Sequence, residues 1–269
     1  MGDPCRSPCR RVVIAAALAA LALPIPAVPF TAGAVPNELV EAPPPCSAPQ
    51  ERLPLGAPTT TAAPPGPIPT PEAPGDYRHR LTPSPYGWVR LPVWCVWVEP
   101  VAAGDDAAHR RDRLWLAAVA AALAEWARAG VGVHPTDDPE AAQVRVWRRR
   151  PPLRMGPDGR ARASHGRAQL SLMEARSKGR RWLEPRVEVW IAQGQGARGL
   201  QATALHELGH AFGLWGHSDD PGDAMAAVPG ANPVLELSER DRATLRWLQA
   251  QPSRIGEPLE PASGPGARP

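Results

Sequence analysis

The chain has 269 residues, of which 36 are proline and 24 are glycine, and its formal net charge is +3 at pH 7. This length suffices for one domain with a sizeable core, with proline-rich segments left over outside it. The small positive charge gives no reason to expect a nucleic-acid partner, and four cysteines are too few for the disulfide framework of a small secreted protein.

Residues 1–34 have the pattern of an export signal. Three arginines precede an uncharged run over residues 12–35, and Ala32-Gly33-Ala34 offers a small-residue cleavage site. The run is long enough to span a bilayer if it is retained, but its prolines suit the end of a signal better than a helix interior. We therefore expect an exported protein, secreted, periplasmic or lumenal, which would be membrane-anchored only if this segment stayed uncleaved.

Residues 35–76 are rich in proline, alanine and threonine. Such a composition cannot bury a core and favours extended chain, so we interpret it as a disordered linker. It leaves one domain over residues 77–259 and a flexible tail over residues 260–269. In an exported protein Cys46 and Cys95 can pair and tie the linker to the domain, and closing a loop of that length stabilises a fold by about 4 kcal/mol.

The first element predicted within the domain is a strand over residues 91–98, starting at Pro92 and apolar on both faces. Residues 105–129 carry apolar side chains at helical spacing and stop at Gly130, which predicts a long packing helix. Short alternating runs then predict further strands, and they cover residues 144–147, 168–172 and 187–191, with a weak strand start at 131–133.

Residues 145–167 contain eight arginines against one aspartate, which invites a nucleic-acid interpretation. We favour a solvated loop instead. Prolines at 151 and 152 and glycines at 156 and 159 mark this loop, and no aromatic residue inside it could stack on a base.

The most informative stretch runs from Leu205 to Ser218. If it is helical, His206 and His210 lie on one face about one turn apart, so that both imidazoles can reach a single Zn²⁺. Glu207 then lies beside the metal. A carboxylate there can take a proton from a zinc-bound water and pass it to a leaving amine, which is the chemistry of the HExxH signature in peptide hydrolysis.

The residues that follow add a third candidate ligand. Gly213 can end the helix in a left-handed conformation and let the chain turn back towards the metal, which brings in His217. Three neutral imidazoles with one position left for water suit a catalytic zinc, whereas a structural zinc is closed by four protein ligands.

These residues resemble the metzincin metallopeptidases, and within them the matrixins, whose pattern is HExxHxxGxxH followed by a methionine turn. Met225 stands where such a chain carries that methionine, and Ser238 and Asp241 look like a capping box at the start of the last helix. The resemblance implies an α+β fold with a twisted mixed sheet, a long packing helix, a zinc-site helix and a small C-terminal subdomain that ends in a helix. It also implies an edge strand that lines the cleft and pairs with extended substrate.

The resemblance further implies a zinc-dependent endopeptidase with Zn²⁺ as cofactor and a protein or peptide as substrate. His206, His210 and His217 would be the ligands and Glu207 the general acid/base. We expect it to act as a monomer.

Two features depart from the family pattern. His217 comes one residue later than the third histidine of the family, and we expect Gly216 to absorb the extra position through backbone angles that only glycine permits. No tyrosine follows Met225, so an auxiliary tyrosine of the kind some metzincins use is absent.

Three alternatives stay open. The third ligand could be a carboxylate, either Asp219, Asp220 or Glu239. The chain could be a non-catalytic zinc-binding surface domain, although such a module has no physical need for the base Glu207. Finally, Cys46 could bind the zinc and hold the enzyme latent, as a propeptide cysteine does in matrixins, but Pro45-Cys46-Ser47 does not match that family's propeptide motif.

Overall fold

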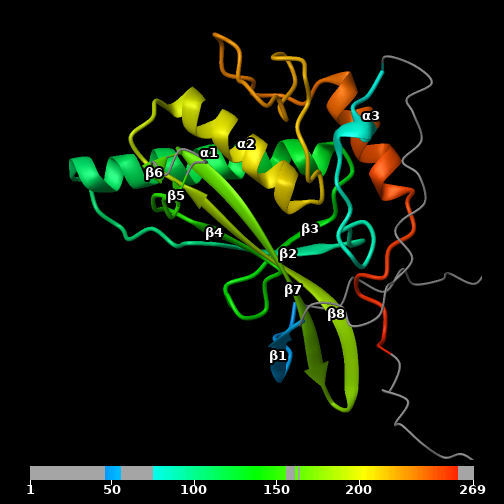
Figure 1. Cartoon of the computed structure of the whole chain (residues 1–269). Coiled ribbons are helices and arrows are strands. Elements are labelled where there is room, and N and C mark those ends of the chain that lie inside the picture. Colours follow the sequence, from blue (N-terminus) through cyan, green and yellow to red (C-terminus); the bar gives the residue numbers. More distant parts are fainter. Residues whose placement is uncertain (1–45, 56–74, 156–160, 163, 260–269) are drawn as a thin grey trace, which may run out of the picture. The chain divides into compact units, whose positions relative to one another are not determined.

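The fold is α+β, as predicted, and its main feature is a six-stranded mixed sheet of order β1-β7-β8-β4-β2-β3. A computed structural model describes residues 46–55, 75–155, 161–162 and 164–259 (Figure 1). The strands of the sheet are β1 (Glu51–Pro54), β2 (Trp94–Val98), β3 (Val133–Pro135), β4 (Val144–Trp147), β7 (Gly166–Ser177) and β8 (Arg180–Ile191). The remaining elements are a small hairpin of β5 (Arg154–Met155) and β6 (Ala161–Arg162), the 3₁₀ helix η1 (Arg78–Arg80), and the helices α1 (Ala107–Arg128), α2 (Ala197–Ala211) and α3 (Glu239–Gln249).

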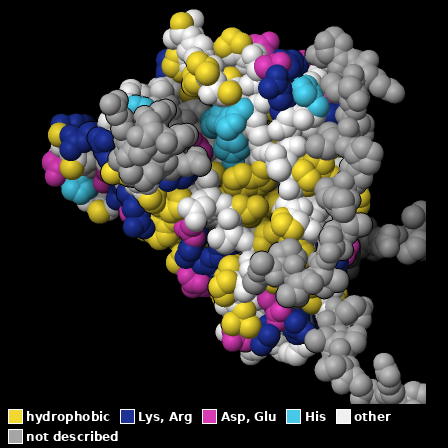
Figure 2. Space-filling view, viewed as in Figure 1, with side chains coloured by type: hydrophobic (Ala, Val, Ile, Leu, Met, Phe, Trp, Pro, Cys, Tyr) yellow, Lys and Arg dark blue, Asp and Glu magenta, His cyan; other side chains and the backbone are white. Residues whose placement is uncertain are grey.

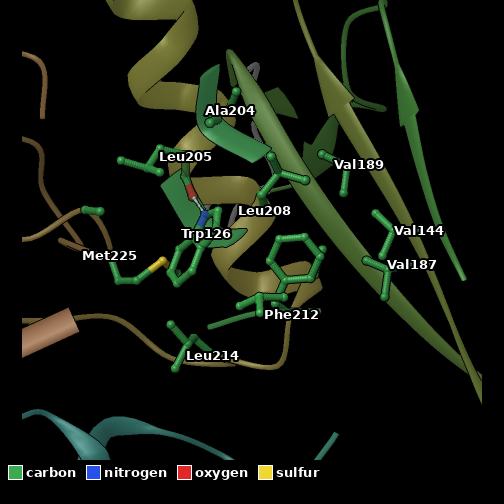
Figure 3. Close-up of a cluster of buried hydrophobic side chains, with 14 of the residues drawn as sticks. Trp126, Val144, Val187, Val189, Ala204, Leu205, Leu208, Phe212, Leu214 and Met225 are labelled. Atoms are coloured by element: carbon green, nitrogen blue, oxygen red, sulfur yellow. Dashed lines mark hydrogen bonds between the residues drawn. The ribbon is translucent and has the colours of Figure 1, made fainter. Parts of the chain in front are cut away.

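The long packing helix predicted over residues 105–129 is confirmed as α1. Asp106 caps its start by accepting a hydrogen bond from the His109 amide at 2.9 Å. The chain leaves the helix at Gly130, whose φ of 99° lies in the left-handed region. Trp126 near its end donates from Nε1 to the Leu205 carbonyl at 2.9 Å, which ties α1 to α2 (Figure 3).

Strand alternation gives the sheet a core face and an outer face. On the core face, valines of β4 and β8 are fully buried against α2, where Figure 3 shows Leu208 and Phe212 directed at them. On the outer face, Arg145 of β4 donates to Glu188 of β8 at 2.8 Å. The predicted strand over residues 144–147 is therefore confirmed, and its burial alternates along the strand.

The strand predicted over residues 91–98 starts at Trp94 instead of Pro92. It is nearly buried on both faces, as expected, because Trp97 on the outer face packs against Trp147 with ring centroids 4.7 Å apart. It is not the centre of the sheet, since only the short β3 lies beyond it. The weak strand start predicted at 131–133 corresponds to β3, which begins at Val133.

The runs predicted at 168–172 and 187–191 are the two ends of one hairpin. β7 and β8 have 12 residues each and pair along their whole length. They are joined at Lys178 and Gly179, whose φ angles of 48° and 76° match a tight hairpin turn. Only Val187–Trp190 of β8 pairs with β4, so the other half of the hairpin projects beyond the sheet (Figure 1).

The linker predicted over residues 35–76 is wrong for residues 46–55, which belong to the fold. β1 pairs antiparallel with the projecting half of β7, with Glu51 opposite Arg176 and Pro54 opposite Met173. Proline fits here because it closes a short edge strand, where a missing N–H costs little. The composition of residues 35–76 did not predict this strand, because the residues around it are rich in proline.

The predicted pairing of Cys46 with Cys95 is confirmed, with the two Cα atoms 5.9 Å apart. The Cys46 thiol is therefore not free to serve as a latency ligand. The export signal over residues 1–34, the linker residues 35–45 and 56–74, and the tail over 260–269 lie outside the described residues. None of the helices in the described part of the chain combines the length and apolarity that a bilayer crossing requires.

Candidate metal centre

The three predicted histidines come together at one place. His206 and His210 lie on one face of α2, with ring centroids 4.9 Å apart. The helix ends at Ala211, and Gly213 just beyond it has a left-handed φ of 106° as expected. The chain turns back there, so that the centroid of the His217 ring lies 5.3 Å from that of His206 and 4.9 Å from that of His210. One ligand atom from each histidine lies within 4.8 Å of the others, so the three could hold a metal ion. Histidine side chains gather accordingly on the face in Figure 2.

Backbone carbonyls orient two of the rings. His206 Nδ1 lies 2.9 Å from the Ala224 carbonyl, and His210 Nδ1 lies 2.8 Å from the Leu214 carbonyl. Because a carbonyl oxygen only accepts, each Nδ1 carries the proton and each Nε2 keeps a lone pair for a metal. Burial lowers the pKa of His206, and it lowers that of His210 to about 3, so both rings are neutral near pH 7.

The extra loop residue is accommodated by packing. Leu214 is fully buried, and Trp215 stacks on the His210 ring with centroids 5.6 Å apart and planes 16° apart. Gly216 does not have a left-handed φ, so the expected reason for this glycine is wrong. It is needed because a Cβ at this position would overlap the carbonyl oxygen of Arg80 in η1.

The rival carboxylate ligands are engaged elsewhere or exposed. Asp219 accepts from Arg240 at 2.9 Å and lies 3.3 Å from Arg80, while Asp220 lies 3.5 Å from Arg240. Glu239 is an exposed residue of α3. Over the residues that the structure describes, the metal-binding group consists of the three histidines without a carboxylate.

Glu207 is buried beside the histidines, with 9% of its surface exposed. Burial raises the pKa of its carboxyl to about 7, although a hydrogen bond from the Ala168 backbone acts to lower it. Gly166 at the start of β7 fits against it, because a Cβ there would lie only 2.7 Å from Glu207 Oε1. A carboxyl with this pKa can both take up and release a proton near neutral pH. Neither Gly166 nor Ala168 could be identified from the sequence, because their contact depends on the hairpin register.

Met225 lies under α2, as expected for the methionine of the resemblance. Its side chain is fully buried, and a Cβ at Gly209, between the two helical histidines, would overlap its sulfur. Figure 3 shows the sulfur directed towards the Trp126 ring. The Met225 carbonyl accepts from the Ser218 amide at 2.7 Å, which joins this turn to the residue after His217.

Asp241 at the start of α3 holds the same turn. The predicted capping box of Ser238 and Asp241 is confirmed. In addition, the fully buried Asp241 carboxylate accepts from the Ala224 amide at 2.8 Å and from the Tyr77 hydroxyl at 2.7 Å. Since the Ala224 carbonyl orients His206, Asp241 acts on a candidate ligand through a single residue, Ala224. The sequence indicated the cap but not this second role.

A cavity of about 470 Å³ opens beside His206 and Glu207. Its wall is mostly small or apolar and includes Gly166, Thr203, Ala226, Ala227, Pro229 and Val234. The cavity therefore offers space for an uncharged side chain next to the candidate base. No family model matches the chain, and no match is found among curated proteins.

Proposed function

We propose that this chain is an exported, zinc-dependent endopeptidase of metzincin type. His206, His210 and His217 bind the metal, and Glu207 is the general acid/base. The observation that carries the proposal is the position of Glu207, a buried carboxyl with a pKa of about 7 beside three imidazoles that could share one ion. A module that only bound zinc would gain nothing from such a group.

The donor set fits zinc. Three neutral nitrogen ligands are the ligand type of catalytic zinc sites that keep one position open. The tautomers of His206 and His210 are fixed by the Ala224 and Leu214 carbonyls. When bound, zinc would polarise the carbonyl of the scissile bond and make a water molecule acidic enough to lose a proton near neutral pH.

The residues of the chain handle the proton and the substrate. Glu207 accepts the proton from water at a carboxylate oxygen and later donates it to the leaving amine, and its pKa of about 7 suits both directions. The cavity beside it takes one substrate side chain, and its small and apolar wall favours an uncharged one.

β7 supplies an edge for an extended peptide, in line with the resemblance. The Ala192 amide donates to the His165 carbonyl at 2.7 Å, which fixes the alternation of the hairpin. The backbone groups of Gly166, Ala168 and Leu170 therefore point away from β8, towards an edge that no other strand of the described residues pairs with. The Ala168 amide contacts Glu207 at this edge. A peptide that pairs with the edge therefore lies beside Glu207, the proposed general base.

Export is supported by the disulfide of Cys46 and Cys95, because such bonds persist in oxidising compartments. The same bond is compatible with secreted, periplasmic and lumenal locations.

The test is mass-spectrometric mapping of cuts in a peptide library by the purified full chain loaded with zinc. Glu207→Gln should keep the metal and lose about 10²–10⁴-fold in turnover, the usual contribution of general acid–base catalysis. The matched control is Glu239→Gln, which changes an exposed carboxylate on α3 and should leave both zinc content and turnover unchanged. Turnover by Glu207→Gln close to wild type would refute the mechanism. A zinc-loaded wild type that cuts no peptide would point to the non-catalytic binding domain.

A further inference from the structure

We infer that β1 closes one end of the substrate-binding edge, so that the enzyme engages only about four extended residues on the amino side of the bond it cuts. This rests on the proposed peptidase function and adds to it the extent of substrate recognition, which ends about four residues before the cut, so that residues further towards the amino end contribute little. The inference follows from where β1 ends on β7 and from the contacts at the two limits of the open edge.

The open edge has two limits. At one end the Glu207 carboxyl lies against the start of β7, where a Cβ at Gly166 would come within 2.7 Å of its Oε1 and the Ala168 amide faces it, which marks the place of the chemistry. At the other end the Leu172 carbonyl accepts from the Leu55 amide at 3.3 Å, directly after β1. Since alternate residues face this edge, Leu170 is the one residue between these limits whose backbone groups face outwards.

The distance available is short. Ala168 and Leu172 are four positions apart, and a strand rises about 3.4 Å per residue, so the open edge beyond the base spans about 14 Å. An extended peptide can place about four residues there. A longer extended segment would meet Leu55 and Pro54, which already pair with β7 at Leu172 and Met173.

The direction of the peptide decides which side of the cut is limited. β7 starts at Gly166, beside Glu207, and runs away from the site towards Ser177. β1 pairs with the same edge antiparallel, and antiparallel pairing is the more stable kind per residue. A substrate bound in that sense points its amino end towards β1, while its carboxyl side runs past Gly166 into the cavity.

β1 is held too firmly to be displaced easily by a substrate strand. Arg52 donates to Glu184 of β8 at 2.5 Å, and these side chains are only 11% and 5% exposed. The Gln50 side chain accepts from the Lys178 amide at 2.9 Å in the hairpin turn. The disulfide of Cys46 keeps the segment near its place even when the pairing opens, which favours its return over a free peptide.

The experiment measures kcat/KM of the zinc-loaded full chain for two series of peptides built around one mapped cut site. One series carries from one to about eight residues before the cut, and the other is extended after the cut. In wild type we expect kcat/KM to rise up to about the fourth residue before the cut and then change less than about twofold. A rise that continues through the longest amino-side peptide overturns the inference. A limit in the carboxyl-side series instead overturns the assigned direction.

A variant that combines Cys46→Ser, Cys95→Ser and Arg52→Ala should loosen β1, and it should then gain several-fold in kcat/KM from residues beyond the fourth. A folded variant that keeps the wild-type limit would show that β1 is not its cause. If the variant does not fold, the peptide series with wild type still tests whether recognition ends about four residues before the cut. Failure of wild type to cut any peptide refutes the proposed function and this inference together, whereas cutting without a length limit refutes the inference alone.

Discussion

Replacing Glu207 by glutamine should change how the stability of the metal-free protein depends on pH. Glutamine has nearly the shape of a protonated carboxyl, stays neutral at every pH and keeps an oxygen for the Ala168 amide. The variant therefore reports the stability of a protein in which this position is never ionised. All other titrating groups are shared, so they cancel when the two free energies of unfolding are subtracted.

The sign follows from the two pKa values of Glu207. In the folded protein burial raises its pKa to about 7, from the ordinary value of 4.5 expected for the unfolded chain. Below pH 4.5 the group is protonated in both states and the two proteins differ by a constant. As pH rises from 4.5 to about 7 the unfolded chain ionises while the folded one keeps its proton, so wild type loses stability relative to the variant, and above that pH the difference is constant again.

The magnitude is the pKa difference multiplied by about 1.4 kcal/mol per unit, which gives about 3 kcal/mol. Little is subtracted for solvent screening, because the residue is only 9% exposed. Urea unfolding of both proteins, stripped of metal and held in a chelator, measures the difference at several values from about pH 4 to about pH 8.5. A difference in unfolding free energy that stays flat over this range would refute the claim that burial raises the pKa of Glu207.

Two further predictions concern the third candidate ligand, His217, and the buried carboxylate of Asp241. His217→Ala should lower zinc affinity by several orders of magnitude, more than the roughly 10–100-fold typical of outer partners, whereas Asp219→Ala should keep its zinc because its carboxylate already pairs with Arg240. Zinc content after dialysis against a competing chelator compares the two variants, and the reverse order would restore the carboxylate-ligand alternative. Asp241→Ala should lower the free energy of unfolding by about 3–5 kcal/mol, because it leaves the buried Tyr77 hydroxyl and the Ala224 amide without an acceptor. Chemical denaturation measures this loss, and a loss under about 1 kcal/mol would contradict it.

The features that could be predicted from the sequence are those that depend only on residues within one continuous segment. His206, Glu207 and His210 share a helix, so their spacing alone sets which side chains meet. Gly213 and the capping box of Ser238 are likewise local, because a left-handed residue and a helix start depend on a few neighbouring positions.

The features that were missed depend on pairing between distant segments. Nothing in the sequence around Ala168 indicates that its amide meets Glu207, since this contact exists only once β7 has its register with β8 and packs on α2. The projecting half of the hairpin escaped notice because charged side chains occupy it. Glu174 there accepts from Arg176 at 2.6 Å and from Arg181 at 2.8 Å, and such ion pairs leave no apolar alternation to detect.

The disulfide also bears on the order in which the chain assembles. β1 must find a partner 125 residues further along the chain, as between Glu51 and Arg176, and contacts this distant form slowly. Cys46 and Cys95 are only 49 residues apart, so their bond can close before the hairpin exists. Once closed, the disulfide holds β1, the first strand in the sequence, close to β2 while the other strands are still pairing. β1 is the last strand to pair, but it is then already tethered near its final position, so it needs only a short search to find β7.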